Sequence, residues 1–158
     1  MPGNKQPVSI LAVIYNSNPL TESDIEVLLL ERADLPGYWQ SVTGSRDGEE
    51  TMRETAIREV LEETGLVAGQ YELSDWQCQN HYEIYPHWQH RYPVGVTQNV
   101  EHVFGVQLPV RVEIKISPRE HLNYQWLPLQ AAADKVFSPS NRDMILQLPQ
   151  RVIRKLHE

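Results

Sequence analysis

Runs of apolar and β-branched residues alternate with turn-rich stretches along the chain, and the runs have the length of strands. Val8 to Tyr15 (VSILAVIY) is almost wholly apolar, which is typical of a buried strand. After a turn-rich loop from Asn16 to Asp24, Ile25 to Leu30 (IEVLLL) predicts a second strand. Gly37 to Gly44 predicts a short third strand that ends in glycine. Later strands are predicted at Glu72 to Cys78, Tyr82 to His87, Val100 to Leu108 and Asn123 to Leu127.

A helix is predicted from Thr51 to Thr64. Thr51 and Glu54 have the spacing of a capping box at its start, and Gly65 is a suitable residue for its C-terminal stop. One face of this helix collects apolar side chains, and we expect that face to pack against the sheet. The apolar positions are Met52, Ala56, Ile57, Val60 and Leu61.

A last helix is predicted near the C-terminus. Ser138 and Pro139 are residue types that favour its N-cap and its first position. Pro149 would kink or end that helix, or begin another turn. Strands first, one helix in the middle and one at the end indicate an α/β fold with a mixed sheet covered on both faces. We find no internal repeat or linker, so we expect a single domain over residues 1–158.

Carboxylates gather on another side of the middle helix. Glu59, Glu62 and Glu63 are neighbours there, because residues three and four apart lie together on a helix. Their mutual repulsion costs stability, and Arg58 can offset part of it by pairing with Glu62. Clustered carboxylates are ligands that Mg²⁺ prefers, often while it also binds substrate phosphates. The alternative is a solvated helix face with scattered charge.

Composition excludes several other classes of protein. The formal net charge of −7 disfavours a surface that follows nucleic-acid phosphates. Cys78 is the only cysteine, so we expect neither an intrachain disulfide nor a cysteine-based zinc site. The polar start of the chain lacks the apolar region of a signal peptide, and no apolar run approaches the roughly 20 residues of a membrane span. We expect a cytoplasmic or otherwise reducing compartment, and we infer no obligate protein partner.

The loop before the helix turns the acidic cluster into a recognisable motif. Gly44, five residues, Glu50 and seven residues lead into the continuous stretch Arg58 to Leu66 (REVLEETGL), and together they resemble the complete signature of the Nudix hydrolases. At ordinary residue frequencies these fixed positions coincide by chance with a probability on the order of 10⁻⁷ per chain. The resemblance implies an α/β/α sandwich and hydrolysis of a pyrophosphate linkage with Mg²⁺, for which Mn²⁺ is a substitute.

The resemblance also implies roles for individual residues. Glu59 and Glu63 would bind Mg²⁺, Glu62 would act as a further ligand or as the base, and Arg58 would orient a glutamate. Glu120, in EHLNYQW, would be a third metal ligand from outside the helix. Without the resemblance, Glu120 would be interpreted as an exposed loop residue.

Similarity extends beyond the signature to five further stretches: PVSILAVIY, YWQSVTGS, HRYPVGVTQNVEHVFGVQLP, EHLNYQWLP and SPSNR. These stretches resemble those of one branch of the family, the Nudix enzymes that convert dihydroneopterin triphosphate to the monophosphate and pyrophosphate in folate biosynthesis. Two alternatives remain, namely a (deoxy)nucleoside triphosphate pyrophosphohydrolase that controls nucleotide pools and a non-catalytic domain that binds a nucleotide.

This branch of the family implies a set of substrate-binding residues. Cations would contact phosphate, a threonine would lie beside the metal, aromatic residues would line the ring pocket, and a serine would touch substrate. Each residue also has a structural alternative: a surface cation, strand packing or helix capping. The residues are Lys5, Arg32, Thr43, Tyr82, Glu83, Ile84, Tyr85 and Ser138.

Overall fold

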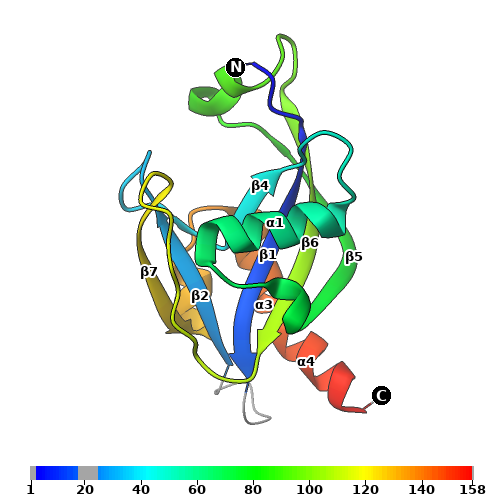
Figure 1. Ribbon diagram of the computed structural model, residues 1–158, viewed down its shortest axis with the longest axis vertical. Helices are drawn as coiled ribbons and strands as arrows, with labels where there is room; N and C mark the ends of the chain where they lie inside the picture. The colour runs from blue at the N-terminus through cyan, green and yellow to red at the C-terminus, as the bar shows by residue number, and fades with distance from the viewer. Residues whose placement is uncertain (1–2, 18–24, 158) are drawn as a thin grey trace.

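A mixed, 7-stranded sheet forms the centre of the protein. The computed structural model describes residues 3–157 except for residues 18–24 (Figure 1). The strands run in the order β3-β2-β1-β6-β5, with β4 paired to β1 and β7 paired to β2. Their bounds are β1 Val8–Ser17, β2 Ile25–Arg32, β3 Trp39–Gln40, β4 Val42–Ser45, β5 Glu72–Glu83, β6 Gln98–Leu108 and β7 His121–Pro128.

The pairing of β1 brings several chain segments to one end of the sheet. β6 runs parallel to β1 along one edge, from the pair Val8–Val100 to the pair Asn16–Leu108. The other edge is shared: β2 pairs with the end of β1, and β4 pairs with its start at residues 9–12. Because β2 is antiparallel to β1, its last residue, Arg32, returns toward the start of β1 and pairs there with His121 at the start of β7. The start of β7, the end of β2 and β4 therefore meet near one another.

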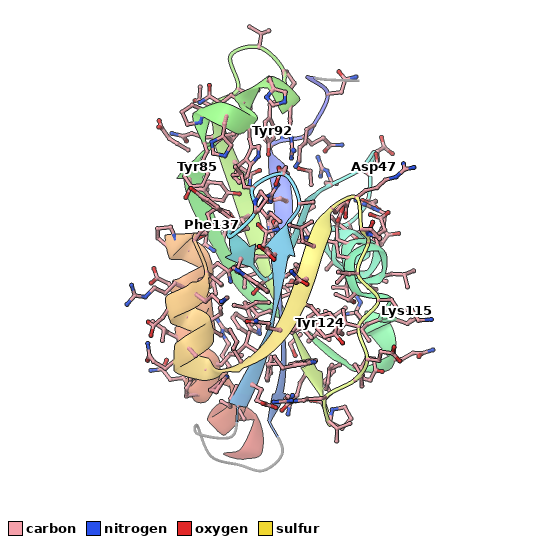
Figure 2. All side chains as sticks on the ribbon, turned by 90° about the vertical axis from the view of Figure 1, so that its left-hand side faces the viewer. Asp47, Tyr85, Tyr92, Lys115, Tyr124 and Phe137 are labelled. Atoms are coloured by element: carbon pink, nitrogen blue, oxygen red, sulfur yellow. The ribbon has the colours of Figure 1, made fainter. Side chains whose placement is uncertain are left out.

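Helices cover both faces of the sheet (Figure 2). The side chains of β1 alternate, so that Ile10 and Ile14 belong to the core beneath α1, whereas Leu11 and Val13 belong to the core beneath α2, α3 and α4. This arrangement is the predicted α/β/α sandwich. The helices are α1 Met52–Thr64, α2 Leu129–Lys135, α3 Pro139–Leu146 and α4 Leu148–His157, with 3₁₀ turns η2 Ala68–Gln70 and η3 Pro86–Arg91. Among the described residues, no helix is both long and apolar enough to cross a membrane.

The predicted helix signals are confirmed. The Thr51 side chain accepts from the backbone of Glu54, and the Glu54 carboxylate accepts from the Thr51 backbone at 2.9 Å. Gly65 ends α1 in the left-handed region, at φ 78°. Ser138 is the N-cap of α3, and Pro149 lies at the start of α4, so a new helix begins there.

The predicted apolar face of α1 is wrong in part. Leu61 is 48% exposed, and the buried face instead includes Glu59 and Glu63 along with Ala56 and Val60. The contacts of α1 with β4 and β1 determine which side of the helix is covered. The apolar character of the residues alone does not determine it, and the carboxylates of Glu59 and Glu63 are held against the sheet.

The two strands predicted after α1 are one strand, β5. The pairing of β5 with β6 shifts register between Asp75 and Gln79, where Gln77 has a φ of 55° and its backbone N–H donates to Asp75 Oδ1 at 2.8 Å. A β-bulge therefore accommodates the polar stretch between the two predicted strands, so that they continue as one. The strand predicted to reach His87 ends at Glu83, because Pro86 begins η3 and has no N–H for a ladder.

Other boundaries also differ from the prediction. The strand predicted over Gly37 to Gly44 is two short strands, β3 and β4, separated by Ser41, whose backbone N–H donates to Asn141 Oδ1 at 2.8 Å. Helix α2 was not predicted. Of the predicted loop from Asn16 to Asp24, the first two residues belong to β1, and residues 18–24 lie outside the described residues.

Candidate active site

Helix α1 places Glu59 and Glu63 one turn apart on its buried side, and Glu63 is only 2% exposed. Gly44 of β4 makes this possible, because a Cβ atom there would overlap the Glu59 carboxylate. The glycine of the motif therefore serves close packing of strand on helix. It is not needed for a left-handed backbone, since Gly44 has no positive φ.

Arg58 connects the carboxylates of the motif. Its Nε and Nη2 donate to the two oxygens of Glu50 at 2.7 and 2.9 Å, and its Nη1 donates to Glu59 Oε1 at 2.7 Å. The predicted pair with Glu62 is present at 3.3 Å, and Nη2 also donates to the Ser45 carbonyl at 3.0 Å. The Arg58 guanidinium lowers the pKa of Glu50 to about 2. Glu50, which sequence analysis treated only as a motif position, fixes the arginine that holds Glu59.

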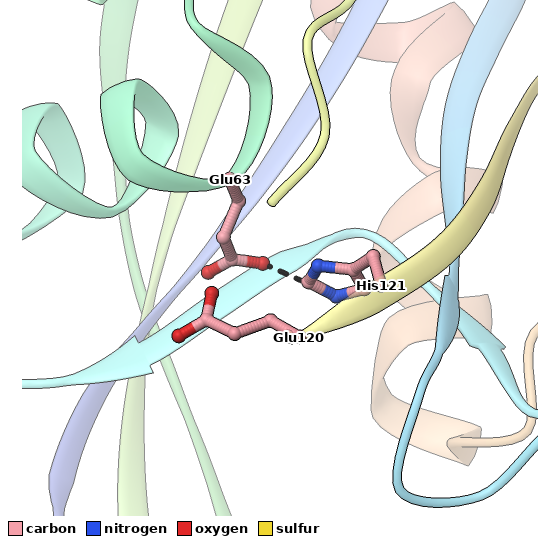
Figure 3. A group of neighbouring side chains, drawn as sticks. All are labelled: Glu63, Glu120 and His121. Atoms are coloured by element: carbon pink, nitrogen blue, oxygen red, sulfur yellow. Dashed lines mark ion pairs between the residues drawn. The ribbon is translucent and has the colours of Figure 1, made fainter. Parts of the chain in front are cut away.

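The end of α1 meets the start of β7 in a cluster that could hold a metal ion. Glu63, Glu120 and His121 each offer one ligand atom, and these atoms lie within 4.8 Å of one another (Figure 3). Sequence analysis predicted Glu63 and Glu120 but gave no role to His121, although it lies in the same EHL stretch. Glu59 is not in this group, although its carboxylate interacts with that of Glu63 and its Oε1 accepts from Arg58.

The donor atoms of this cluster fit a divalent cation. Oε1 of Glu63 is buried and has no hydrogen-bond partner among the described residues, and the same holds for Nδ1 of His121. His121 Nε2 lies 3.5 Å from Glu63 Oε1, a distance that would allow an ion pair. Burial lowers the pKa of His121 to about 4, so the ring is neutral near neutral pH and is suited to ligate a metal. The contact is therefore one between a neutral ring and the Glu63 carboxyl group.

Burial and repulsion make the two helix carboxylates electrostatically costly. Burial raises the pKa of Glu59, and burial together with Glu59 and Glu120 raises the pKa of Glu63 well above its usual range. A cation between these groups would oppose both shifts, because it favours the charged carboxylates.

A cavity of about 1010 Å³ extends from this cluster over the sheet. Glu62 is exposed and does not line it. The other predicted site residues do, and they are Lys5, Arg32, Thr43, Arg58, Glu59, Glu63, Tyr82, Glu83, Ile84, Tyr85, Glu120 and Ser138.

One wall of the cavity contains residues that sequence analysis did not assign. Arg32 donates from Nε and Nη2 to the two oxygens of Asp34 at 2.7 and 2.8 Å, and its guanidinium lies 4.3 Å from the centre of the Trp88 ring. Arg91 and Trp88 also donate to Asp34. Asp34 therefore joins the predicted phosphate-binding Arg32 to η3, and it could have been found only from the fold.

Aromatic rings lie beside this wall. Tyr85 and Phe137, both labelled in Figure 2, have ring centres 5.9 Å apart, and Tyr85 also contacts Trp88 at 5.5 Å. Tyr82 is 37% exposed, and its hydroxyl accepts from Asn99 Nδ2 at 3.0 Å. The cavity thus has an acidic end at the cluster and an aromatic side suited to a flat ring.

Comparison with known proteins agrees with this geometry. Residues 5–148 match the NUDIX domain family, so the chain belongs to the Nudix family. It is 46% identical to dihydroneopterin triphosphate diphosphatase of Escherichia coli (strain K12), over 90% of this chain and 92% of that protein. The enzyme of the same name from Haemophilus influenzae is 34% identical, over 89% and 86%. A solved structure of the E. coli dihydroneopterin triphosphate pyrophosphohydrolase superposes with a TM-score of 0.84 at 44% identity, covering 94% of this chain and 99% of that one.

Proposed function

We propose that this protein is a Mg²⁺-dependent pyrophosphohydrolase that converts dihydroneopterin triphosphate to dihydroneopterin monophosphate and pyrophosphate, with Mn²⁺ as a substitute ion. The observation that carries the proposal is a single cavity that joins the acidic cluster at Glu63 to the aromatic residues near Tyr85. The relatives of that name match the chain over most of its length. Both halves of a pterin triphosphate therefore have a complementary surface in one space.

The acidic end supplies the chemistry. Mg²⁺ held there would stabilise charge on the phosphoryl oxygens and would make a water molecule more acidic. Glu59, Glu63 and Glu120 would supply oxygen ligands to the ion, with His121 beside Glu63, and Arg58 holds Glu59 toward the same end of the cavity. Phosphoryl transfer needs little covalent help from the protein, so positioning and neutralisation of charge dominate.

The remaining polar residues position the phosphates. Lys5 is half-buried, its backbone N–H donates to the Arg91 carbonyl at 2.9 Å, and burial followed by the charges of Arg91 and Arg32 lowers its pKa. These three cations lie close enough to repel one another, and an anionic triphosphate would relieve that repulsion. Thr43 lines the same cavity, but its hydroxyl donates to the Ile10 carbonyl at 2.9 Å, so it would have to release that bond before it could donate to a phosphate oxygen.

Glu62 could act as a further ligand or as the base only if its side chain moved. It is exposed and hydrogen-bonded to Arg58, and it lies outside the cavity lining. Its carboxylate would have to leave Arg58 to reach a water near the cluster.

The proposal is tested by steady-state kcat/KM with Mg²⁺ for dihydroneopterin triphosphate, dATP, dGTP and GTP, with pyrophosphate as the product measured. We expect a clear preference for the pterin. A preference for a deoxynucleotide would keep the chemistry but move the role to nucleotide-pool control, and no turnover of any substrate would favour a domain that only binds.

Replacing Glu120 with alanine should raise the Mg²⁺ concentration needed for half-maximal activity and lower the rate. The reason is that Glu120 supplies one of the three ligand atoms of the cluster, while its exposure keeps the cost to the fold small. Glu113→Ala is the matched control, because Glu113 is an exposed glutamate in the segment that leads to the same strand and does not line the cavity. Identical Mg²⁺ titrations for Glu120→Ala and wild type would remove Glu120 from the site.

A further inference from the structure

Strands β5 and β6 present a patch of polar side chains inside the cavity, away from the metal cluster. Asn99 and Glu101 are two residues apart on β6 and therefore point to the same face of the sheet. Their partners across the ladder are Tyr82 and Asn80 of β5. All four line the cavity, and we call them the polar patch.

Glu101 is an unusual residue to find there. It is only 4% exposed, and among the described residues no cation pairs with it. Its Oε1 accepts from Asn80 Nδ2 at 3.1 Å and from Ser140 Oγ of α3 at 3.4 Å. Both hydrogen bonds end on the same oxygen, which leaves Oε2 without a donor from the described residues. Burial raises the pKa of Glu101 to about 7.

Asn99 adds a second acceptor beside it. The side chain is 1% exposed, and its Nδ2 donates to Ser9 Oγ at 2.7 Å and to the Tyr82 hydroxyl at 3.0 Å. Its Oδ1 is buried and has no partner within the described part of the chain. A buried acceptor without a donor destabilises the fold, so the patch is stabilised by a ligand that brings donors.

The proposed substrate carries donors in this arrangement. The pyrimidine half of a pterin has an amino group next to a ring N–H, so two donors stand side by side, as they also do in guanine. Adenine has an amino group next to a ring nitrogen that only accepts. A carboxylate accepts from two neighbouring donors, whereas it repels the ring nitrogen of adenine.

We propose that Glu101, assisted by Asn99, binds the amino and ring N–H edge of the substrate and determines selectivity for 2-amino-4-oxo rings over adenine. This inference rests on the proposed function, and it deepens the specificity of the same cavity. The stretch Tyr82 to Tyr85 then supplies the face of the ring pocket, and β6 supplies its edge. No residue of the metal cluster takes part, so the effect falls on recognition of the ring.

The substitution Glu101→Gln tests the inference because it keeps the size of the side chain and changes only its pattern of donors and acceptors. The glutamine amide can accept from one donor of the pterin but opposes the other, while it matches the acceptor and donor of adenine. We expect kcat/KM for dihydroneopterin triphosphate to fall about 10- to 100-fold, mainly through KM, and kcat/KM for dATP to be kept or increased. GTP should behave like the pterin.

Two further variants make the outcome specific. Glu101→Asp keeps the charge, but its shorter side chain holds the carboxylate farther from the ligand. This substitution should therefore lower activity on the pterin without any gain on dATP. Glu113→Gln removes an exposed carboxylate outside the cavity and should leave every ratio unchanged. The Glu101→Gln variant should remain folded, because the substitution removes a buried charge without changing the shape of the side chain. Its melting temperature checks this.

The result separates the two proposals. If wild type hydrolyses the pterin but Glu101→Gln keeps the wild-type ratio of pterin to dATP activity within twofold, the inference is overturned and the proposed function stands. If wild type does not hydrolyse the pterin, the proposed function fails, and the ratio of GTP to ATP affinity, measured by calorimetry on wild type and Glu101→Gln, still decides the role of Glu101. An unchanged ratio there would again remove it from ring recognition.

Discussion

Glutamine in place of Glu63 should lower kcat by roughly 10³-fold or more while the protein remains folded. Glu63 is buried between the end of α1 and the start of β7, where it belongs to the cluster with Glu120 and His121. Glutamine keeps the shape of the side chain but removes the charge that a divalent cation needs. The measurement is steady-state turnover with saturating Mg²⁺.

Stability provides the second measurement on the same variant. A carboxyl whose pKa is raised in the folded state contributes stability below its ordinary pKa and loses it as the pH rises through the raised value. Burial raises the pKa of Glu63, so Glu63→Gln without metal should be no less stable than wild type at pH 8. Mg²⁺ should raise the melting temperature of wild type more than that of the variant. Glu49→Gln, at an exposed and unconstrained position of the motif, is the control. Near-normal turnover of Glu63→Gln would contradict the assignment of Glu63 as a metal ligand.

Alanine in place of Gly44 should reduce turnover by about 100-fold or more, with little change in melting temperature. The backbone of Gly44 suits any residue, but the new methyl group would overlap the Glu59 carboxylate. That carboxylate is the far end of a flexible side chain, so it can swing away at small cost to the fold. Once displaced, it loses its 2.7 Å hydrogen bond from Arg58 and its place at the acidic end of the cavity.

Gly69→Ala is the matched control for this substitution. Gly69 lies in η2, it has no positive φ, and a Cβ atom there would meet nothing within 4 Å. Turnover and melting temperature should therefore stay close to wild type. If Gly44→Ala is folded and as active as Gly69→Ala, the position of Glu59 does not matter for the reaction, and its proposed role must be abandoned.

Local signals predicted the parts of the site that lie within one segment. The capping box at Thr51, the stop at Gly65 and the pair of Arg58 with Glu62 depend on residues a few positions apart, so their spacing determines them. Glu50 is eight residues from Arg58, and its role became clear only when the loop before α1 was seen to fold back onto the helix.

Features that depend on contacts across the sheet were missed or misjudged. Leu61 has the position of a core residue on an isolated helix, yet packing on β4 and β1 leaves it half exposed. His121 joins the metal cluster because β7 pairs with the end of β2, and nothing in the local sequence indicates that pairing. Glu101 lies in the mostly apolar strand β6, and the pairing of β6 with β5 determines which face of the strand lines the cavity.

The position of β1 in the sheet also governs how the chain can fold. Its parallel partner β6 ends at Leu108, so this edge of the apolar strand cannot be fully paired during synthesis until that residue has been made. Contacts between segments this far apart in sequence are slow to form, because loop closure must come first. The metal cluster needs still more chain, since His121 follows β6. Assembly of the metal cluster in the nascent protein therefore requires synthesis at least through His121, after β1 and β6 have both been made.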